Sequence, residues 1–71
     1  MEYYMGQKVL IVTKDGFVVR GLLNNVTPGE IFLADYRMSQ LNHLAENVCK
    51  GSGDDYLIIP KFSVISLCRS D

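Results

Sequence analysis

The chain has 71 residues, which predicts one domain, residues 1–71. Its net charge of −1 counts against a strongly basic nucleic-acid binder, and its two cysteines are too few for a scaffold held by disulfides. A chain of this size buries only about 60% of the surface that its unfolded form exposes, so it is marginally stable alone. Because one histidine and no Cys/His ligand pattern exclude most metal sites, we expect no cofactor and an oligomer as the stabilising support.

The first two predicted elements are β-strands joined by a tight turn. Lys8–Thr13 is almost entirely aliphatic or β-branched, and the Asp15-Gly16 pair that follows is a strong hairpin signal, since glycine tolerates a positive φ. The second strand, Phe17–Val26, contains a lone Gly21. A glycine inside a strand predicts a bend, a bulge or a close approach of another backbone.

A turn and a third strand follow, and after them the spacing of the apolar residues changes from that of a strand to that of a helix. The Pro28-Gly29 pair is typical of a type II turn, in which the glycine takes a positive φ, and Ile31–Ala34 is the third strand. Beyond it the apolar residues fall along one helical face, at Met38, Leu41, Leu44, Ala45 and Val48. With Ser39 as N-cap and Gly51 just past the end, this spacing predicts a short amphipathic helix at about residues 39–50.

Two more strands complete the chain. Tyr56–Ile59 is stopped by Pro60, which cannot donate to a ladder, and Phe62–Cys68 is the last strand. The predicted fold is mainly β: a small five-stranded, strongly bent antiparallel barrel with one short helix between its third and fourth strands. We expect the strands near residues 7–14, 16–26, 30–36, 56–60 and 63–68.

This arrangement resembles the Sm-like superfamily, which includes the Sm and LSm proteins and bacterial Hfq. The first Sm motif is matched by Asp15-Gly16, by Gly21 five residues later, by Leu23 and by Ile31-Phe32-Leu33-Ala34-Asp35. The second motif, a short strand, a tight turn and a last strand, is matched by residues 58–67, with Lys61 in the place of the lysine of the Hfq turn. The resemblance covers residues 6–35 and 56–68 and implies an Sm-like, SH3-like barrel.

The chain departs from the family pattern in the loops. Thr27-Pro28-Gly29-Glu30 is one residue shorter than the family's loop, has Glu30 in the place of an asparagine and lacks the base-stacking aromatic. Pro60-Lys61 replaces the Arg-Gly of the second motif, and the 36–55 connection is long. The resemblance therefore implies the fold without the family's uridine pocket.

The resemblance also implies a homo-oligomeric ring of five to seven subunits in which the loops 27–30 and 60–63 face a central pore. Neighbouring subunits would pair the fourth strand with the fifth, burying the interface side chains Ile58, Ile59, Val64 and Ile65. A lysine repeated around the pore would attract single-stranded RNA, or DNA, although the subunit is weakly acidic. The implied contacts are Lys61 for phosphate, Phe62 for stacking, Ser63 for hydrogen bonds, and Thr27 and Glu30, whose carboxylate opposes phosphate.

Several of these residues also have a purely structural interpretation. Phe62 also suits a core position and Lys61 a solvated turn, while Tyr36 and Arg37, a second stacking-plus-cation pair, also suit a strand end beside a loop. No carboxylate pair, activated nucleophile or phosphate loop is present, so we predict no enzyme and infer no small-molecule substrate. The alternative function is a protein-interaction or structural assembly module of SH3-like form. Without a signal peptide or a run of ~20 apolar residues, we expect a cytoplasmic protein with no membrane partner.

Overall fold

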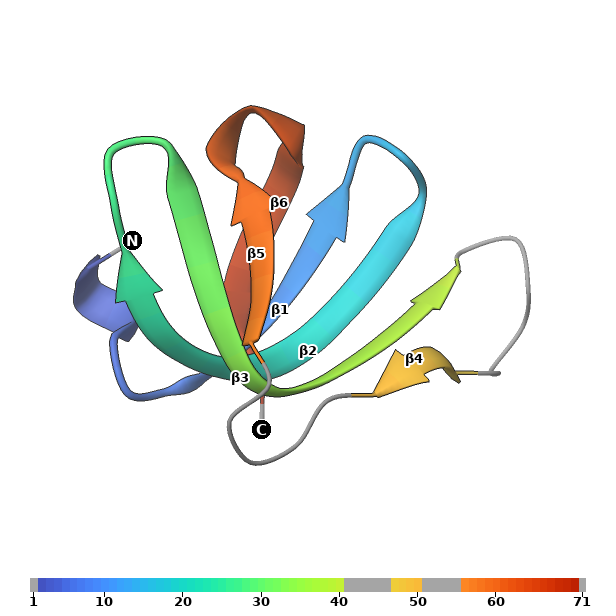
Figure 1. The fold of residues 1–71 in the computed structure, drawn as a ribbon, viewed down its shortest axis with the longest axis horizontal. Coiled ribbons are helices and arrows are strands. Elements are labelled where there is room, and N and C mark those ends of the chain that lie inside the picture. The colour runs from blue at the N-terminus through green and yellow to red at the C-terminus, as the bar shows by residue number, and fades with distance from the viewer. Residues whose placement is uncertain (1, 41–46, 51–55, 71) are drawn as a thin grey trace.

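The computed structural model describes residues 2–40, 47–50 and 56–70, which form a strongly bent antiparallel sheet (Figure 1). A 3-10 turn, η1 (Glu2–Tyr4), precedes β1 (Lys8–Thr13), β2 (Phe17–Val26) and β3 (Glu30–Gln40). The rest comprises β4 (Asn47–Lys50), β5 (Tyr56–Pro60), the 3-10 turn η2 (Lys61–Ser63) and β6 (Val64–Arg69). The predicted mainly β, strongly bent fold is confirmed, and its five expected strands correspond to β1, β2, β3, β5 and β6.

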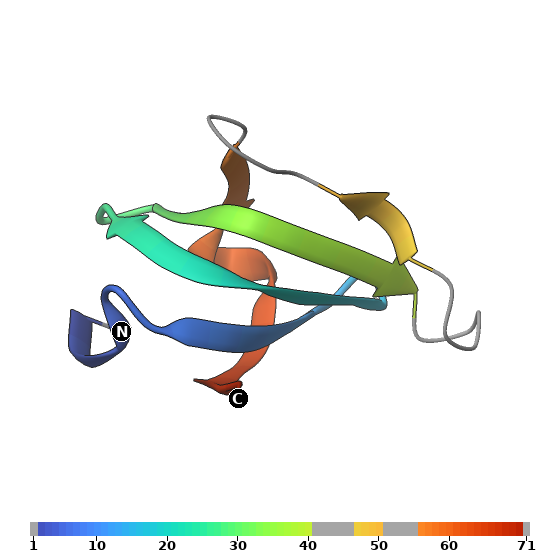
Figure 2. The same cartoon turned by 90° about the horizontal axis from the view of Figure 1, so that it is seen from below.

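β3 pairs with three strands: with β2 along most of its length, and with β5 and β4 over separate halves. The strand order is β4-β3-β2-β1-β6, and β5 also pairs with β3. Residues 30–34 of β3 pair with β5, whereas residues 37–39 pair with β4. The short η2 then connects β5 directly to β6 at the other edge of the sheet, so the sheet rolls up into a barrel (Figure 2). Among the described residues no ladder joins β5 to β6, which leaves each with one open edge.

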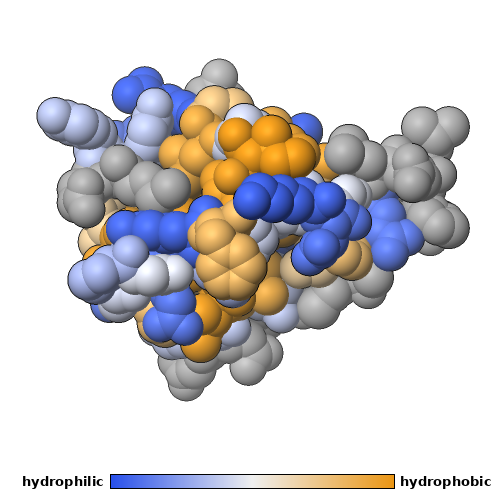
Figure 3. All heavy atoms as spheres, turned by 90° about the horizontal axis from the view of Figure 1, so that it is seen from above, coloured by the Kyte–Doolittle hydropathy of each residue, from blue (hydrophilic) through white to orange (hydrophobic). Residues whose placement is uncertain are grey.

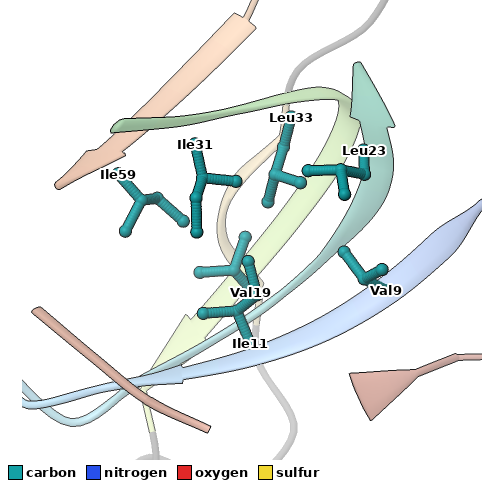
Figure 4. Packing of buried hydrophobic residues seen from close by; sticks show 7 residues of the cluster. All are labelled: Val9, Ile11, Val19, Leu23, Ile31, Leu33 and Ile59. Carbon is teal, nitrogen blue, oxygen red and sulfur yellow. The ribbon is translucent and has the colours of Figure 1, made fainter. Parts of the chain in front are cut away.

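The inner face of this bend holds the hydrophobic core. Alternation along β1 and β2 turns Val9, Ile11, Val19 and Leu23 inward. Among the described residues, the buried cluster joins four strands (Figure 4) and consists of Val9, Ile11, Val19, Leu23, Ile31, Leu33 and Ile59. At about 1.5–3 kcal/mol for each fully buried aliphatic side chain, this cluster is the main source of stability in the subunit.

A β-bulge at Asp35 divides β3 into two halves. Leu22 pairs with Ala34 but Arg20 pairs with Arg37, so β3 carries one residue more than β2 at this point. Asp35 has a φ of 47°, a left-handed conformation that aspartate adopts more readily than most residues. Because side chains alternate along a strand, the extra residue exchanges the two faces of β3 beyond it. Tyr36 and Met38 consequently pack against the core, and Arg37 is exposed.

Gly21 lies opposite this bulge, and the close approach that the sequence predicted is present. A Cβ at Gly21 would lie 3.1 Å from the carbonyl oxygen of Ala34 and 3.2 Å from the Cα of Tyr36. Both are backbone atoms, so neither can move aside cheaply. The hairpin signal is confirmed as well: Gly16 has a φ of 86°, and its backbone nitrogen donates to the carbonyl oxygen of Thr13 at 3.1 Å.

The helix predicted at about residues 39–50 is wrong wherever the structure describes this segment. β3 runs to Gln40, Asn47–Lys50 form β4, and residues 41–46 lie outside the described residues. The spacing of the apolar residues suits a helical face, but Tyr36 and Met38 also fit the period of a strand and cover the core. A short helix is marginal without such packing, so tertiary contacts decide the outcome. None of the described residues belongs to a helix long and apolar enough to cross a membrane.

Candidate functional site

Three connections meet at one end of the barrel: the turns at 14–16 and 27–29, and η2 (Figure 1). A simple meander would place its two successive turns at opposite ends. Here β2 is bent along its length, so both of its ends rise to the same side. The bent strands thereby form a composite surface from segments that are far apart in the sequence. We call this surface, residues 14–16, 27–30 and 61–63, the loop end.

Backbone hydrogen bonds hold η2 between the two turns. The backbone nitrogen of Lys61 donates to the carbonyl oxygen of Gly29 at 2.9 Å. On the other side, the backbone nitrogen of Lys14 donates to the carbonyl oxygen of Ser63 at 2.7 Å. Because these bonds involve only backbone atoms, the side chains of Lys61 and Phe62 remain available for a ligand. Lys14 is a second cation at this end that the sequence did not indicate, because its place beside η2 follows from the pairing of β1 with β6.

Thr27 closes the turn at 27–30. Its hydroxyl oxygen accepts a hydrogen bond from the backbone nitrogen of Glu30 at 3.1 Å, and its own backbone nitrogen donates to the carbonyl oxygen of Glu30 at 2.9 Å. The predicted type II turn is wrong, because Gly29 does not have a positive φ. A side-chain hydroxyl supplies the closure that the glycine conformation was expected to give. The Glu30 side chain is exposed.

The η2 segment presents an aromatic ring beside a cation. Pro60 enters it with a φ of −62°, and the hydroxyl of Ser63 donates to the carbonyl oxygen of Pro60 at 3.1 Å. Phe62 is 76% exposed, so its interpretation as a core residue is wrong. Lys61 is half-buried. Seen from above, apolar side chains lie exposed among hydrophilic ones on this side of the molecule (Figure 3).

The structure brings five of the seven predicted contact residues together and separates the other two from them. Lys61, Phe62, Ser63, Thr27 and Glu30 all belong to the loop end. Tyr36 and Arg37 lie beyond the bulge, where they face opposite sides of the sheet: Tyr36 packs against the core and Arg37 is exposed. A contact of these two residues with one ligand stays a prediction that is separate from the loop end.

The four predicted interface residues fall into two groups. Ile58 on β5 and Ile65 on β6 are 49% and 64% exposed, and Tyr56 adds a third exposed side chain at 49%. Ile59 belongs to the buried core, and Val64 packs against it. The two open-edged strands thus carry exposed apolar side chains, which the open edges of a sheet usually do not present without a partner.

The chemistry available at the loop end is that of binding. It combines an exposed aromatic face, a cation and hydroxyls beside an exposed carboxylate. An aromatic ring stacks on planar groups, and an ammonium attracts anions. Within residues 2–40, 47–50 and 56–70, no group of three His, Cys, Asp or Glu side chains is arranged to hold a metal ion.

Comparison with known proteins bears on the fold. No protein-family model matches the chain, and no curated protein matches it in sequence. Among solved structures, the chain is similar to an Sm protein of Pyrococcus abyssii in complex with a uridine heptamer, with a TM-score of 0.80. The match covers 97% of this chain and 90% of that one at 24% sequence identity. The chain therefore has the Sm-like fold that its sequence motifs indicated.

Proposed function

We propose that the chain assembles into a closed ring of five to seven copies whose loop end binds single-stranded RNA. The observation that carries the proposal is the hydrogen bond between the backbone nitrogen of Lys61 and the carbonyl oxygen of Gly29, which fixes η2 against the 27–30 turn. The structurally similar Sm protein supports it, because that protein was solved with a uridine heptamer. In this proposal the chain is a binding protein and not an enzyme.

The two open edges support a ring. When β5 of one subunit pairs with β6 of the next, the backbone groups of both edges gain partners, and Ile58 and Ile65 leave the solvent. This pairing uses the same two edges in every subunit, so it is a head-to-tail contact that can close into a ring. It also supplies the support that a small subunit needs.

Phe62 and Lys61 carry the proposed contact with RNA. Phe62 is exposed enough to stack on an unpaired base, an interaction worth about 1–3 kcal/mol for each base. Lys61, repeated in every subunit, attracts the phosphates and positions the strand. The exposed Glu30 repels them, so we expect weak binding. Contacts with base edges give sequence specificity, whereas contacts with phosphates only position the strand. We therefore also expect little sequence preference.

A titration of a fluorescently labelled seven-nucleotide polyuridine strand tests this proposal. We expect binding at about 50 mM salt that is lost at high salt, since released counterions favour binding only in dilute salt. Lys61→Gln should flatten the salt dependence, whereas Arg69→Gln, which removes an exposed cation of β6, should leave it unchanged. If the wild type binds neither polyuridine nor polyadenine at low salt, the protein-interaction alternative replaces the proposal.

A further inference from the structure

A second cationic surface lies away from the loop end, on the outer face of the sheet. An open groove of about 500 Å³ is lined there by Lys8, Arg20, Asp35, Arg37 and Ser70, among others. Lys8, Arg20 and Arg37 are all exposed, and they come from three neighbouring strands, β1, β2 and β3. Three cations and one carboxylate give this groove a net positive charge, although the chain as a whole is slightly acidic.

The two arginines stand in direct cross-strand register. Arg20 of β2 lies opposite Arg37 of β3, whereas Lys8 of β1 lies opposite Leu22. Like charges directly opposite each other destabilise an antiparallel pair. Among the residues that the structure describes, no ion pair joins Asp35 to either arginine. A row of cations without a carboxylate partner is the arrangement that an external anion stabilises.

The bulge at Asp35 creates this row. Without the extra residue, Arg20 would pair with Tyr36, and Arg37 would face the core side of the sheet. The structure instead holds Asp35 at a φ of 47° and turns Arg37 outward, beside Arg20. Left-handed conformations of residues other than glycine cost of order 1–3 kcal/mol and cluster at ligand sites. The bulge therefore brings both arginines to the lining of the groove.

We propose that this outer groove binds a phosphate group, as an anion site separate from the loop end. The guanidinium groups of Arg20 and Arg37 offer planar pairs of N–H donors that match phosphate oxygens, and Lys8 adds a third positive charge. Ser70 is placed there by the hydrogen bond from its backbone nitrogen to the carbonyl oxygen of Lys8 at 2.9 Å, and its hydroxyl can donate to the ligand. The phosphate belongs either to a small molecule, such as a free nucleotide, or to a nucleic-acid backbone.

The experiment is a titration of the isotope-labelled protein, followed by the shifts of its backbone amide signals in NMR spectra. The probes are inorganic phosphate, uridine monophosphate and the seven-nucleotide polyuridine strand. We expect at least one probe to shift the amides of Arg20, Gly21 and Arg37. A response to phosphate or to the mononucleotide identifies a small-molecule site, and a response to the strand alone identifies the backbone of a nucleic acid.

Four variants decide between this site and the loop end. Arg20→Gln and Arg37→Gln should each weaken the response at the groove about tenfold or more, because each removes charge-assisted hydrogen bonds. Lys14→Gln and Lys61→Gln, which change cations of the loop end, should leave it intact. Equal loss in both pairs, or no response of the groove amides to any probe, overturns the proposal. The proposed function stands or falls separately, on the response of Lys61 and Phe62.

Thermal unfolding provides a second measurement. Phosphate that binds the folded protein should raise the unfolding temperature of the wild type and leave that of Arg37→Gln unchanged. Should either Gln variant fail to fold, Arg37→Lys keeps the charge but loses the planar pair of donors, and it should still bind phosphate more weakly than the wild type. Wild-type affinity in Arg37→Lys together with an unchanged melting temperature in phosphate would contradict the site.

Discussion

The backbone nitrogen of Lys61 lies 2.9 Å from the carbonyl oxygen of Gly29, and this one hydrogen bond joins two loops that are distant in the sequence. It is possible because Glu30 pairs with Pro60, the first register position of the β3–β5 ladder. The ladder thus continues by one bond into the loops. As a result, the orientation of Phe62 depends on the sheet and not on a free loop.

Replacing Phe62 by alanine separates binding from stability. Because the ring is 76% exposed, Phe62→Ala should change the free energy of unfolding by less than about 0.5 kcal/mol. It should weaken the binding of single-stranded RNA by about 1–3 kcal/mol for each stacked base. Chemical denaturation and fluorescence anisotropy measure the two effects. Tyr3→Ala, which removes another exposed aromatic ring at 90% exposure, is the matched control and should bind normally.

Neutralising Glu30 should strengthen RNA binding. Glu30→Gln removes an exposed carboxylate from the surface that attracts phosphates, and we expect RNA affinity to rise by about 0.2–1 kcal/mol, up to about fivefold. The gain should shrink at high salt, because salt screens exposed charges. Glu30→Asp keeps the charge and should show no gain. Equal affinities of the Gln variant and the wild type at about 50 mM salt would remove Glu30 from the site.

The bulge can be tested at Gly21. A Cβ there meets the carbonyl oxygen of Ala34 at 3.1 Å and the Cα of Tyr36 at 3.2 Å, so Gly21→Ala must displace backbone. We expect a loss of about 1–3 kcal/mol in the free energy of unfolding, as for other overpacking substitutions. Gly29→Ala is the control: a Cβ at Gly29 has nothing within 4 Å, and its φ is not positive. Equal stability of the two variants would show that the close approach is not required.

The proposed subunit contact is sensitive to charge on β6. Ile65 is 64% exposed in the isolated subunit, so Ile65→Asp should leave the subunit folded but dissociate the ring, because a carboxylate would be buried without a partner. Size exclusion with light scattering gives the mass, and circular dichroism reports the fold. Tyr3→Asp adds the same charge away from both edges and should retain the wild-type mass. A ring of unchanged mass in Ile65→Asp would place the contact elsewhere.

Sequence patterns predicted the strands well because turn chemistry is local. Asp15-Gly16 sets its own hairpin, whereas both faces of Lys8–Thr13 are mostly apolar, so only the structure shows that Val9, Ile11 and Thr13 face inward. A close approach was one of three alternatives that the lone Gly21 predicted, beside a bend and a bulge, but its partners Ala34 and Tyr36 are distant in the sequence and only the fold shows them. The hairpin, by contrast, depends on residues that are neighbours in the chain.

The helix prediction failed because packing of Tyr36 and Met38 against the core decides the conformation of this segment, and periodicity alone does not show that packing. The exchange of faces after Asp35 was not predicted, because a bulge at an aspartate leaves no pattern that distinguishes it from a strand end. The outer row of arginines was missed with it, because its register follows from the bulge. The contact between Lys61 and Gly29 likewise depends on the pairing of β3 with β5, which only the folded chain shows.

Native mass spectrometry of the protein mixed with a seven-nucleotide polyuridine strand tests the central claim most directly, because a single mass reports both the assembly and its ligand. We predict a species of five to seven chains that carries a strand, and the loss of the strand, with the ring retained, when Lys61→Gln and Phe62→Ala are combined. A monomeric mass without bound strand, at micromolar protein and low salt, would contradict the account.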